Sequence, residues 1–347
     1  ELKTKPTQHS VKKLLEYGLQ PDILVCRAEH KIPIDVRSKV ARFCNVEVEA
    51  VIAALDAETI YDVPLLMMEE ELDKIVLKKL ALDIGGVPNL TTWKTFLKKL
   101  KNPKKSIKIG LIGKYVELKD SYKSIAEGLI HAGAHNECSV ELHWIHSESL
   151  KAENTREKLS SLNGILVAPG FGERGVAGKL AAVKYARECN IPFFGICLGM
   201  QCAVVEFAQN VLGLSSSSRE IDDKTQHPVI DLMEEQKKIE NKGGTMRLGA
   251  YSCTLEEGSF AHKAYGTTQI SERHRHRYEF NSAYKEDFEK AGMKASGINP
   301  ETGLVEVVEI PSHPYFIGVQ FHPEYKSTVA NPHPLFIEFI KASIENA

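Results

Sequence analysis

From residue 107 onward, short apolar runs of strand length alternate with longer stretches that have the periodicity of amphipathic helices. The predicted strands cover residues 107–113, 140–145, 165–167 and 192–196, and the predicted helices lie near 121–132, 156–162 and 177–188. This alternation predicts an α/β fold in which a mostly parallel sheet is covered by helices on both faces. Ligands of such sheets bind at the carboxyl ends of the strands, so candidate chemistry is expected there.

The first part of the chain has a similar pattern and predicts a separate domain. We expect helices at 8–18, 33–43 and 64–82, and strands at 22–27 and 48–53. After a further helix near 92–100, the lysine-rich stretch 98–105 is interpreted as a solvated linker. The predicted organisation is a first domain at 1–91, a linker at 92–105 and a second domain at 106–347.

One apolar run ends in a cysteine that has the sequence context of a nucleophile. Cys197 lies between Gly195 and Gly199, and the helical stretch 201–210 follows directly. Glycines at these positions relieve crowding in a sharp strand-to-helix turn, the nucleophile elbow. The positive end of the helix favours the thiolate, which is the form that attacks carbonyl carbon. A buried packing role is the alternative for an isolated cysteine, but the two glycines favour the elbow.

A base for this nucleophile is expected near the end of the chain. An apolar strand at 315–321 delivers His322, and Glu324 follows two residues later. Imidazole can accept the thiol proton near neutral pH, and a carboxylate on its other nitrogen fixes its orientation. The alternative for this group is a surface turn, because Pro323 separates the two residues.

A third element is the glycine-rich loop that follows the predicted strand at 165–167. Its sequence, Ala168-Pro169-Gly170-Phe171-Gly172, can bring a backbone N–H close to a developing oxyanion, together with the N–H of Leu198. Proline donates no N–H, so the oxyanion contact is assigned to Gly170. A phosphate loop is not expected here, since no Gly-Lys-Ser or Gly-Lys-Thr follows.

Together these residues resemble the triad-type (class I) glutamine amidotransferases. The resemblance implies that Cys197, His322 and Glu324 hydrolyse the side-chain amide of glutamine and release ammonia. It also implies that glutamine is bound by residues at the elbow, the loop and two further positions: Gly170, Leu198, Gly199, Met200, Gln201, Glu220 and Arg277. Arginine suits the α-carboxylate of glutamine and glutamate suits its α-ammonium.

Three further strings, at 1–11, 243–249 and 272–279, resemble the CTP synthase family. The resemblance extends from Lys3 to Phe336 and implies that 1–91 is the C-terminal part of an α/β synthase (amidoligase) domain. It implies conversion of UTP to CTP with ATP and glutamine, GTP as allosteric activator, a homotetramer and a cytoplasmic location. The UTP- or CTP-binding residues implied are Lys3, Thr4, Lys5, Pro6, Thr7, Gln8 and Lys39, and those for ATP are Arg27 and Ala57.

The family's N-terminal phosphate loop and magnesium-binding carboxylates have no counterpart in this sequence. We therefore expect a fragment of a longer chain that retains glutaminase chemistry, with incomplete nucleotide sites. No cofactor is expected for this chain, and Mg²⁺ with ATP is expected for the intact enzyme. A stand-alone glutamyl-peptide hydrolase, or a non-catalytic regulatory or filament-forming module, is the alternative function.

Composition excludes several other classes of protein. The chain has 44 basic and 46 acidic residues, which gives a net charge of −2. It therefore lacks the excess of basic residues that is typical of nucleic-acid-binding domains. No apolar run has the length of a transmembrane helix, so no membrane partner is expected. Seven scattered cysteines predict no disulfide framework. His274 and His276 lie two residues apart, but without a partnered ligand pattern they predict no metal site.

Overall fold

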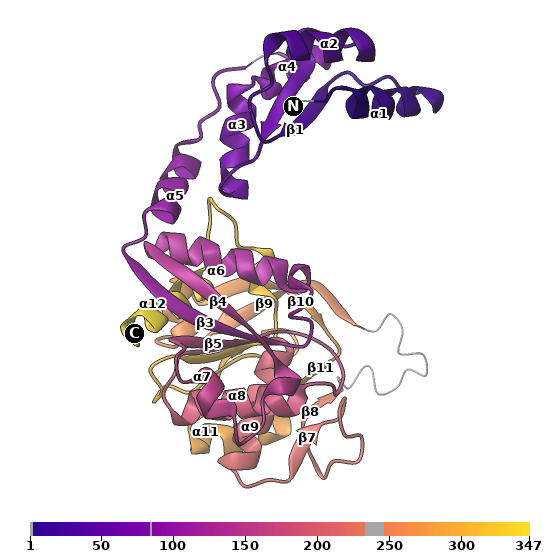
Figure 1. Ribbon diagram of the computed structural model, residues 1–347. Coiled ribbons are helices and arrows are strands. Elements are labelled where there is room, and N and C mark those ends of the chain that lie inside the picture. Colours follow the sequence, from indigo (N-terminus) through magenta and orange to yellow (C-terminus); the bar gives the residue numbers. More distant parts are fainter. Residues whose placement is uncertain (1–2, 84, 233–245) are drawn as a thin grey trace. The chain divides into compact units, whose positions relative to one another are not determined.

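The computed structural model describes residues 3–83, 85–232 and 246–347, and the chain forms two compact units, Glu1–Thr91 and Thr92–Ala347 (Figure 1). Part of the string at 243–249, residues 243–245, lies outside the described residues. Among the helices that the structure describes, none is long and apolar enough to cross a membrane.

The first unit is a small α/β structure around two parallel strands, in which residues from α1, α2 and β2 form the core. Its elements are α1 (Lys5–Glu16), β1 (Leu24–Ala28), α2 (Ile34–Cys44), β2 (Val51–Leu55), α3 (Val63–Glu69) and α4 (Leu72–Lys79). The helix expected at 64–82 is two helices, because Glu71 adopts a left-handed backbone conformation (φ 55°) that ends α3. Arg37 holds Glu70 at this break with two hydrogen bonds of 2.6 and 2.8 Å.

The second unit is built on a nine-stranded sheet with the order β10-β9-β12-β13-β14-β6-β5-β3-β4. From β14 to β4 all neighbours are parallel, and from β10 to β14 all neighbours are antiparallel. The parallel part consists of β3 (Lys105–Gly113), β4 (Cys138–His146), β5 (Gly164–Val167), β6 (Phe193–Ile196) and β14 (Phe316–Val319). The antiparallel part consists of β9 (Arg247–Leu255), β10 (Gln269–His276), β12 (Lys294–Ile298) and β13 (Val305–Glu309).

Helices cover both faces of this sheet and bury two hydrophobic clusters (Figure 1). Contacts with the strands place α8 and α9 on one face and α6 and α12 on the other. These helices are α6 (Lys123–His135), α8 (Val176–Glu188), α9 (Leu198–Asn210) and α12 (Pro334–Glu345). The shorter helices of the unit are α7 (Thr155–Leu159), α10 (Phe260–Tyr265) and α11 (Lys285–Ala291). The predicted α/β fold with a helix-covered sheet is confirmed.

The antiparallel extension was not predicted from the sequence. Along β10 buried and exposed residues alternate strictly, which is the pattern of a strand with one covered face. Its buried positions carry Glu272, His274 and His276, so no apolar alternation marked the strand. A separate three-stranded sheet consists of β7 (Ser216–Ser218), β8 (His227–Leu232) and β11 (Tyr278–Phe280). Its strand β11 follows β10 directly in the chain.

Most of the segment expected to be a linker is a packed helix. α5 (Thr91–Lys101) buries Phe96 and Leu97, and the ring of Phe96 lies edge-on to His131 of α6 at 5.9 Å between centroids. Lys99 also donates to the carbonyl of His135 at 3.2 Å. Residues 92–101 are therefore part of the second unit, because their apolar face is covered by α6 while their lysines remain exposed.

Candidate active site

Cys197 lies between β6 and α9, at the carboxyl end of a central parallel strand. Its backbone angles (φ 51°, ψ −104°) lie in a region that residues with a Cβ rarely adopt. The turn is held because its N–H donates to the carbonyl of Val319 on the neighbouring strand at 2.7 Å. The predicted strand, turn and helix are therefore present, with Cys197 at the N-terminus of α9.

The two flanking glycines are required by close backbone contact. A Cβ on Gly199 would lie 2.2 Å from the carbonyl oxygen of Val167 on β5, and one on Gly195 would lie 2.8 Å from the backbone of Gly199. Both distances are too short for a side chain. The glycines thus allow α9 to pack directly on the ends of β5 and β6.

His322 and Glu324 are brought to the elbow because β14 pairs with β6 in parallel register, with Val319 opposite Ile196. His322 Nδ1 lies 2.7 Å from Glu324 Oε1, and both side chains are buried. Burial by itself disfavours the imidazolium, but interactions with Cys197 and Glu324 outweigh it and raise the pKa of His322 to about 11. Cys197 and Glu324 thus favour the protonated form of His322.

Sequence reasoning missed Gln320, which contacts the nucleophile. Its Nε2 lies 3.6 Å from Cys197 Sγ, and its side chain is fully buried. The signal that could have found it is strand alternation, since Gln320 and His322 are two residues apart and lie on the same side of the strand end. With its nitrogen toward the sulfur, this buried amide can donate a hydrogen bond to Cys197.

The glycine-rich loop is held by two buried lysines, which the sequence analysis also missed. Lys179 of α8 donates to the carbonyl of Ala168 at 2.6 Å, and Lys114 donates to the carbonyl of Phe171. Gly170 lies between these two carbonyls, and a Cβ there would be 3.2 Å from Lys114 Cε and 3.6 Å from the Leu198 side chain. The loop is therefore fixed beside the first residue of α9.

Burial also shifts the protonation of these lysines. It lowers the pKa of Lys114, and it lowers the pKa of Lys179, which is completely buried, to about 8. Two cations close to the elbow create a positive potential at the loop, and this potential favours negative charge on the thiol and on an oxygen bound nearby.

The residues expected to contact glutamine fall into two groups. A small cavity of about 30 Å³ at the elbow is lined by Gly170, Phe171, Cys197, Gln201, Glu220, Met246, His276, Arg277 and Tyr278. Four of the expected residues are thus brought together, and Glu220 accepts a hydrogen bond from the N–H of Gly172 at 2.8 Å. Leu198, Gly199 and Met200 are in the first turn of α9 and are absent from this lining, and the backbone N–H groups of that turn have no partner within the helix.

In the first unit, the residues expected to bind nucleotides lie on surface positions. Gln8 donates to the hydroxyl of Thr4 at 3.2 Å within the start of α1, which also contains Lys5, Pro6 and Thr7, while Lys3 precedes the helix. Lys39 is exposed on α2. Arg27 pairs with Asp56 at 3.0 Å, next to Ala57 at the ends of β1 and β2. These contacts do not test the nucleotide assignments, which stay predictions.

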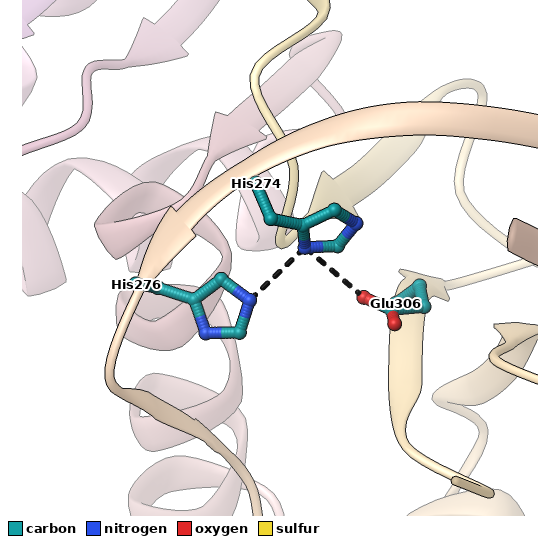
Figure 2. A group of neighbouring side chains, drawn as sticks. All are labelled: His274, His276 and Glu306. Carbon is teal, nitrogen blue, oxygen red and sulfur yellow. Dashed lines mark hydrogen bonds and ion pairs between the residues drawn. The ribbon is translucent and has the colours of Figure 1, made fainter. Parts of the chain in front are cut away.

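His274, His276 and Glu306 form a buried group whose ligand atoms lie within 4.8 Å of one another (Figure 2). His274 Nδ1 lies 3.0 Å from His276 Nε2 and 3.6 Å from Glu306 Oε2. Burial lowers the pKa of His274 to about 2 and that of His276 to about 3, so both rings are neutral.

Although neutral imidazoles and a carboxylate are common metal ligands, this group already has internal partners. Arg247 Nη1 lies 2.6 Å from Glu306 Oε1 and supplies the positive charge that a cation would bring. His276 Nδ1 lies 3.1 Å from the carbonyl of Tyr278, so His276 is held from both of its nitrogens. The group is explained as a support of the end of β10, directly before Arg277, and the absence of a metal stays a prediction.

The seven cysteines are all free thiols, so no disulfide constrains the site. Burial raises the pKa of Cys202, one turn beyond Cys197 in α9, to about 11. Burial also raises the pKa of Cys253 well above the neutral range, so both remain thiols. Neither has the elbow geometry of Cys197.

Comparison with known proteins gives matches over both units. Residues 117–342 match the family model "Glutamine amidotransferase class-I", and residues 1–82 match "CTP synthase N-terminus". The chain is 61% identical over 345 residues to the CTP synthase of Flavobacterium johnsoniae, and 63% identical over 344 residues to that of Cytophaga hutchinsonii. Each alignment covers 99% of this chain and 64% of the relative, so the chain spans about two thirds of their length.

Among solved structures, the chain is similar to the glutaminase domain of Trypanosoma brucei CTPS with bound acivicin. That match has 38% sequence identity and a TM-score of 0.66, and it covers 69% of this chain and 94% of the other. The expectation that a phosphate-loop segment is missing stays a prediction.

Proposed function

The chain belongs to the CTP synthase family, and from this premise we propose that its second unit hydrolyses glutamine through a thioester on Cys197. The observation that carries the proposal is the elbow, with His322 and Glu324 2.7 Å apart beside the thiol. Neither a packing cysteine nor a surface turn requires a strained backbone at Cys197 or a buried histidine that is paired with a buried glutamate beside it.

The reaction is proposed to proceed in two halves. The Cys197 thiolate attacks the side-chain amide carbon of glutamine, and the N–H groups of Gly170 and Leu198 hold the resulting oxyanion. His322 gives its proton to the leaving nitrogen, which departs as ammonia and leaves a thioester. His322 then takes a proton from water as the water attacks the thioester. Glutamate is released, and the thiolate and the protonated histidine are restored.

The amino-acid head of glutamine is proposed to lie between Glu220 and Arg277. Both line the cavity at Cys197, and their charges match the α-ammonium and α-carboxylate of the substrate. The cavity is smaller than the roughly 300–1,000 Å³ of typical small-molecule sites, so glutamine must displace side chains such as the half-exposed Phe171. If these side chains pack against the bound glutamine, they would exclude water from the thioester until ammonia has left.

We extend the proposal to the whole family reaction, in which the ammonia aminates UTP to CTP at the expense of ATP. The match of residues 1–82 to the CTP synthase N-terminus supports it. The expected UTP and ATP residues of the first unit are carried over with it, as are a homotetramer and a cytoplasmic location. Mg²⁺ with ATP is proposed for the intact enzyme in the same way.

GTP is proposed as the activator of the glutaminase. A cavity of about 560 Å³ next to the elbow is lined by three positive side chains, Arg273 and Arg275 of β10 and Lys326, which follows Glu324 and Tyr325. Half-exposed Tyr325 and exposed Leu248 line the same cavity and give it an apolar wall. Guanidinium groups suit phosphate oxygens, so this cavity supports the proposal of a nucleoside triphosphate ligand.

The experiment is glutamine-dependent ammonia release, measured with and without GTP, for wild type, Cys197→Ala and Cys189→Ala. We expect Cys197→Ala to abolish release and Cys189→Ala, which removes an exposed thiol at the end of α8, to retain it. Ammonium chloride should still support CTP formation in Cys197→Ala wherever the wild-type chain forms CTP. Full glutaminase activity in Cys197→Ala would refute the thioester mechanism.

The alternative of a stand-alone glutamyl-peptide hydrolase predicts release of glutamate from peptides and no response to nucleotides. The family match of residues 1–82 argues against it, since such a hydrolase has no use for a synthase segment. A non-catalytic module is disfavoured because Cys197, His322 and Glu324 are all present and adjacent.

A further inference from the structure

We propose that Gln320 is a catalytic residue whose side-chain N–H donates to the sulfur of Cys197 and holds it as the thiolate. The inference rests on the proposed glutaminase function of the same site. It adds a second donor to the sulfur, on the strand that also delivers His322.

The contact between Gln320 and the sulfur is direct and rigid. Gln320 Nε2 lies 3.6 Å from Cys197 Sγ, within the range of hydrogen bonds to sulfur, and the side chain is fully buried. The backbone is fixed as well, because the N–H of Gln320 donates to the carbonyl of Glu306 at 2.9 Å. The N–H of Cys197 donates to Val319, the residue before Gln320, so nucleophile and amide are attached to the same strand end.

The orientation of the amide follows from its second partner. Gln201 Nε2 lies 3.2 Å from Gln320 Oε1 and 2.8 Å from the carbonyl of Tyr278. A carbonyl can only accept, so the nitrogen of Gln201 must point to Tyr278 and to the oxygen of Gln320. The oxygen of Gln320 is thereby placed away from the sulfur, and its nitrogen is the atom that faces Cys197.

The buried group in Figure 2 continues this chain of hydrogen bonds. The carbonyl of Tyr278 also lies 3.1 Å from His276 Nδ1, which must therefore carry the proton. Neutral His276 then accepts at Nε2, so His274 donates from Nδ1 at 3.0 Å (Figure 2). Every donor in this series has its acceptor, and the amide of Gln320 cannot reverse without leaving two buried groups unpaired.

An oriented donor changes the balance between thiol and thiolate. A thiolate accepts hydrogen bonds more strongly than a thiol does, so a fixed N–H favours the charged form. Besides the amide of Gln320, three ionisable groups interact electrostatically with Cys197. They are His322 beyond β14, Lys179 of α8 and Cys202 of α9. Gln320 is the one group of these that has no titrating proton, so its donor is present at every pH.

The test measures alkylation of Cys197 by iodoacetamide against pH, in the absence of glutamine, with peptide mass spectrometry to separate the seven cysteines. In Gln320→Met, which keeps the length but loses the donor, we expect the midpoint of the Cys197 profile to rise by about one pH unit. At pH values below both midpoints the alkylation rate should be about tenfold lower. In the isosteric Gln320→Glu, a carboxylate replaces the donor, and the midpoint should rise further.

Asn299→Leu is the matched control, because it removes an equally buried amide whose nitrogen donates to the carbonyl of Ser252 at 2.9 Å, away from the sulfur. Its Cys197 profile should coincide with that of wild type. Profiles of folded Gln320→Met and Gln320→Glu that coincide with wild type would overturn the proposal. Failure of the proposed function would appear separately, as absent ammonia release by wild type that still has a reactive Cys197.

Steady-state kinetics supply a second readout. Since Gln320 contacts the sulfur and is absent from the lining of the glutamine cavity, Gln320→Met should lower kcat about tenfold with little change in KM. A rise in KM at constant kcat would assign Gln320 to substrate binding and contradict the proposal.

Discussion

The ammonium group of Lys179 lies 2.6 Å from the carbonyl oxygen of Ala168, and the whole side chain is buried. Ala168 comes two residues before Gly170, the proposed oxyanion contact. The buried ammonium of Lys179 therefore helps to fix the backbone of the loop that leads to Gly170. Pro169, which has no N–H to donate, lies between this carbonyl and Gly170.

Replacing Lys179 by methionine should lower kcat for ammonia release by about 10- to 100-fold, since a hydrogen bond from a charged group contributes roughly 1.5–3 kcal/mol. Burial lowers the pKa of Lys179 to about 8, so the ammonium is present below pH 8 and lost above it. Wild-type activity should therefore decline above about pH 8, and Lys179→Met should lack this decline. Lys184→Met, an exposed change on the same helix, is the control.

Replacing Glu324 by glutamine should lower kcat by about 10²- to 10⁴-fold, the range typical of general acid and base catalysis. Glu324 is one of the two partners that raise the pKa of His322 to about 11 against the effect of burial, so the variant's imidazole should lose its proton at lower pH. NMR titration of His322 measures this directly. An unchanged titration of His322 would mean that Cys197 alone stabilises its protonated form. The control is Glu338→Gln on α12, which should change neither kcat nor the His322 titration.

Replacing His276 by glutamine should reduce the loss of stability in acid. In the folded protein the pKa of His276 is lowered to about 3 by burial, whereas its ordinary value is near 6.5. Between these values the unfolded chain binds one more proton than the folded protein does. The free energy of unfolding therefore has its full value above pH 6.5 and falls as the pH decreases below it. One such group contributes a slope of about 1.4 kcal/mol per pH unit.

Urea unfolding of wild type and His276→Gln between pH 7 and about pH 4 measures this slope. The variant should be less stable at pH 7 but should lose stability more slowly in acid. Asn299→Leu, a buried change without a titrating group, should shift the wild-type curve without changing its slope. Parallel curves for His276→Gln and wild type would contradict the assignment of a neutral ring.

Replacing Gly199 by alanine should destabilise the second unit by about 1–3 kcal/mol or more, because its Cβ would lie 2.2 Å from the Val167 carbonyl. The backbone of β5 cannot give way without loosening α9, so activity should fall with the melting temperature. Thermal unfolding and ammonia release measure the two effects. Gly86→Ala, whose Cβ meets open space, should change neither.

The sequence predicted the parallel strands and their helices within a few residues, because amphipathic periodicity and glycine punctuation are local signals. Strand β6 was expected at 192–196 and is observed at Phe193–Ile196, and α8 was expected at 177–188 and is observed at Val176–Glu188. The antiparallel strands β9 and β10 were missed, since β10 buries a glutamate and two histidines where the expected signal is apolar. The break between α3 and α4 was missed because Glu71 gives no sign of its left-handed backbone.

The candidate site shows the same division. Glycine spacing marked Cys197, and the resemblance to CTP synthases, confirmed by the comparisons, named the residues that the structure brings together around it. Lys114 and Lys179 gave no signal, because their partners are 57 and 11 residues away in the chain. Gln320, whose partner is 123 residues away, was marked only by its two-residue spacing from His322.

The elbow at Cys197 was thus marked by the sequence itself, since a strand, two glycines and a helix follow one another directly in the chain. Which groups surround the sulfur was decided only by the tertiary structure, when β14 paired with β6 and brought His322 and Gln320 to it. Burial then fixed their protonation and orientation. A hydrogen-bond partner or a shifted pKa depends on what excludes water from a group, and that property belongs to the packed fold rather than to any segment of the chain.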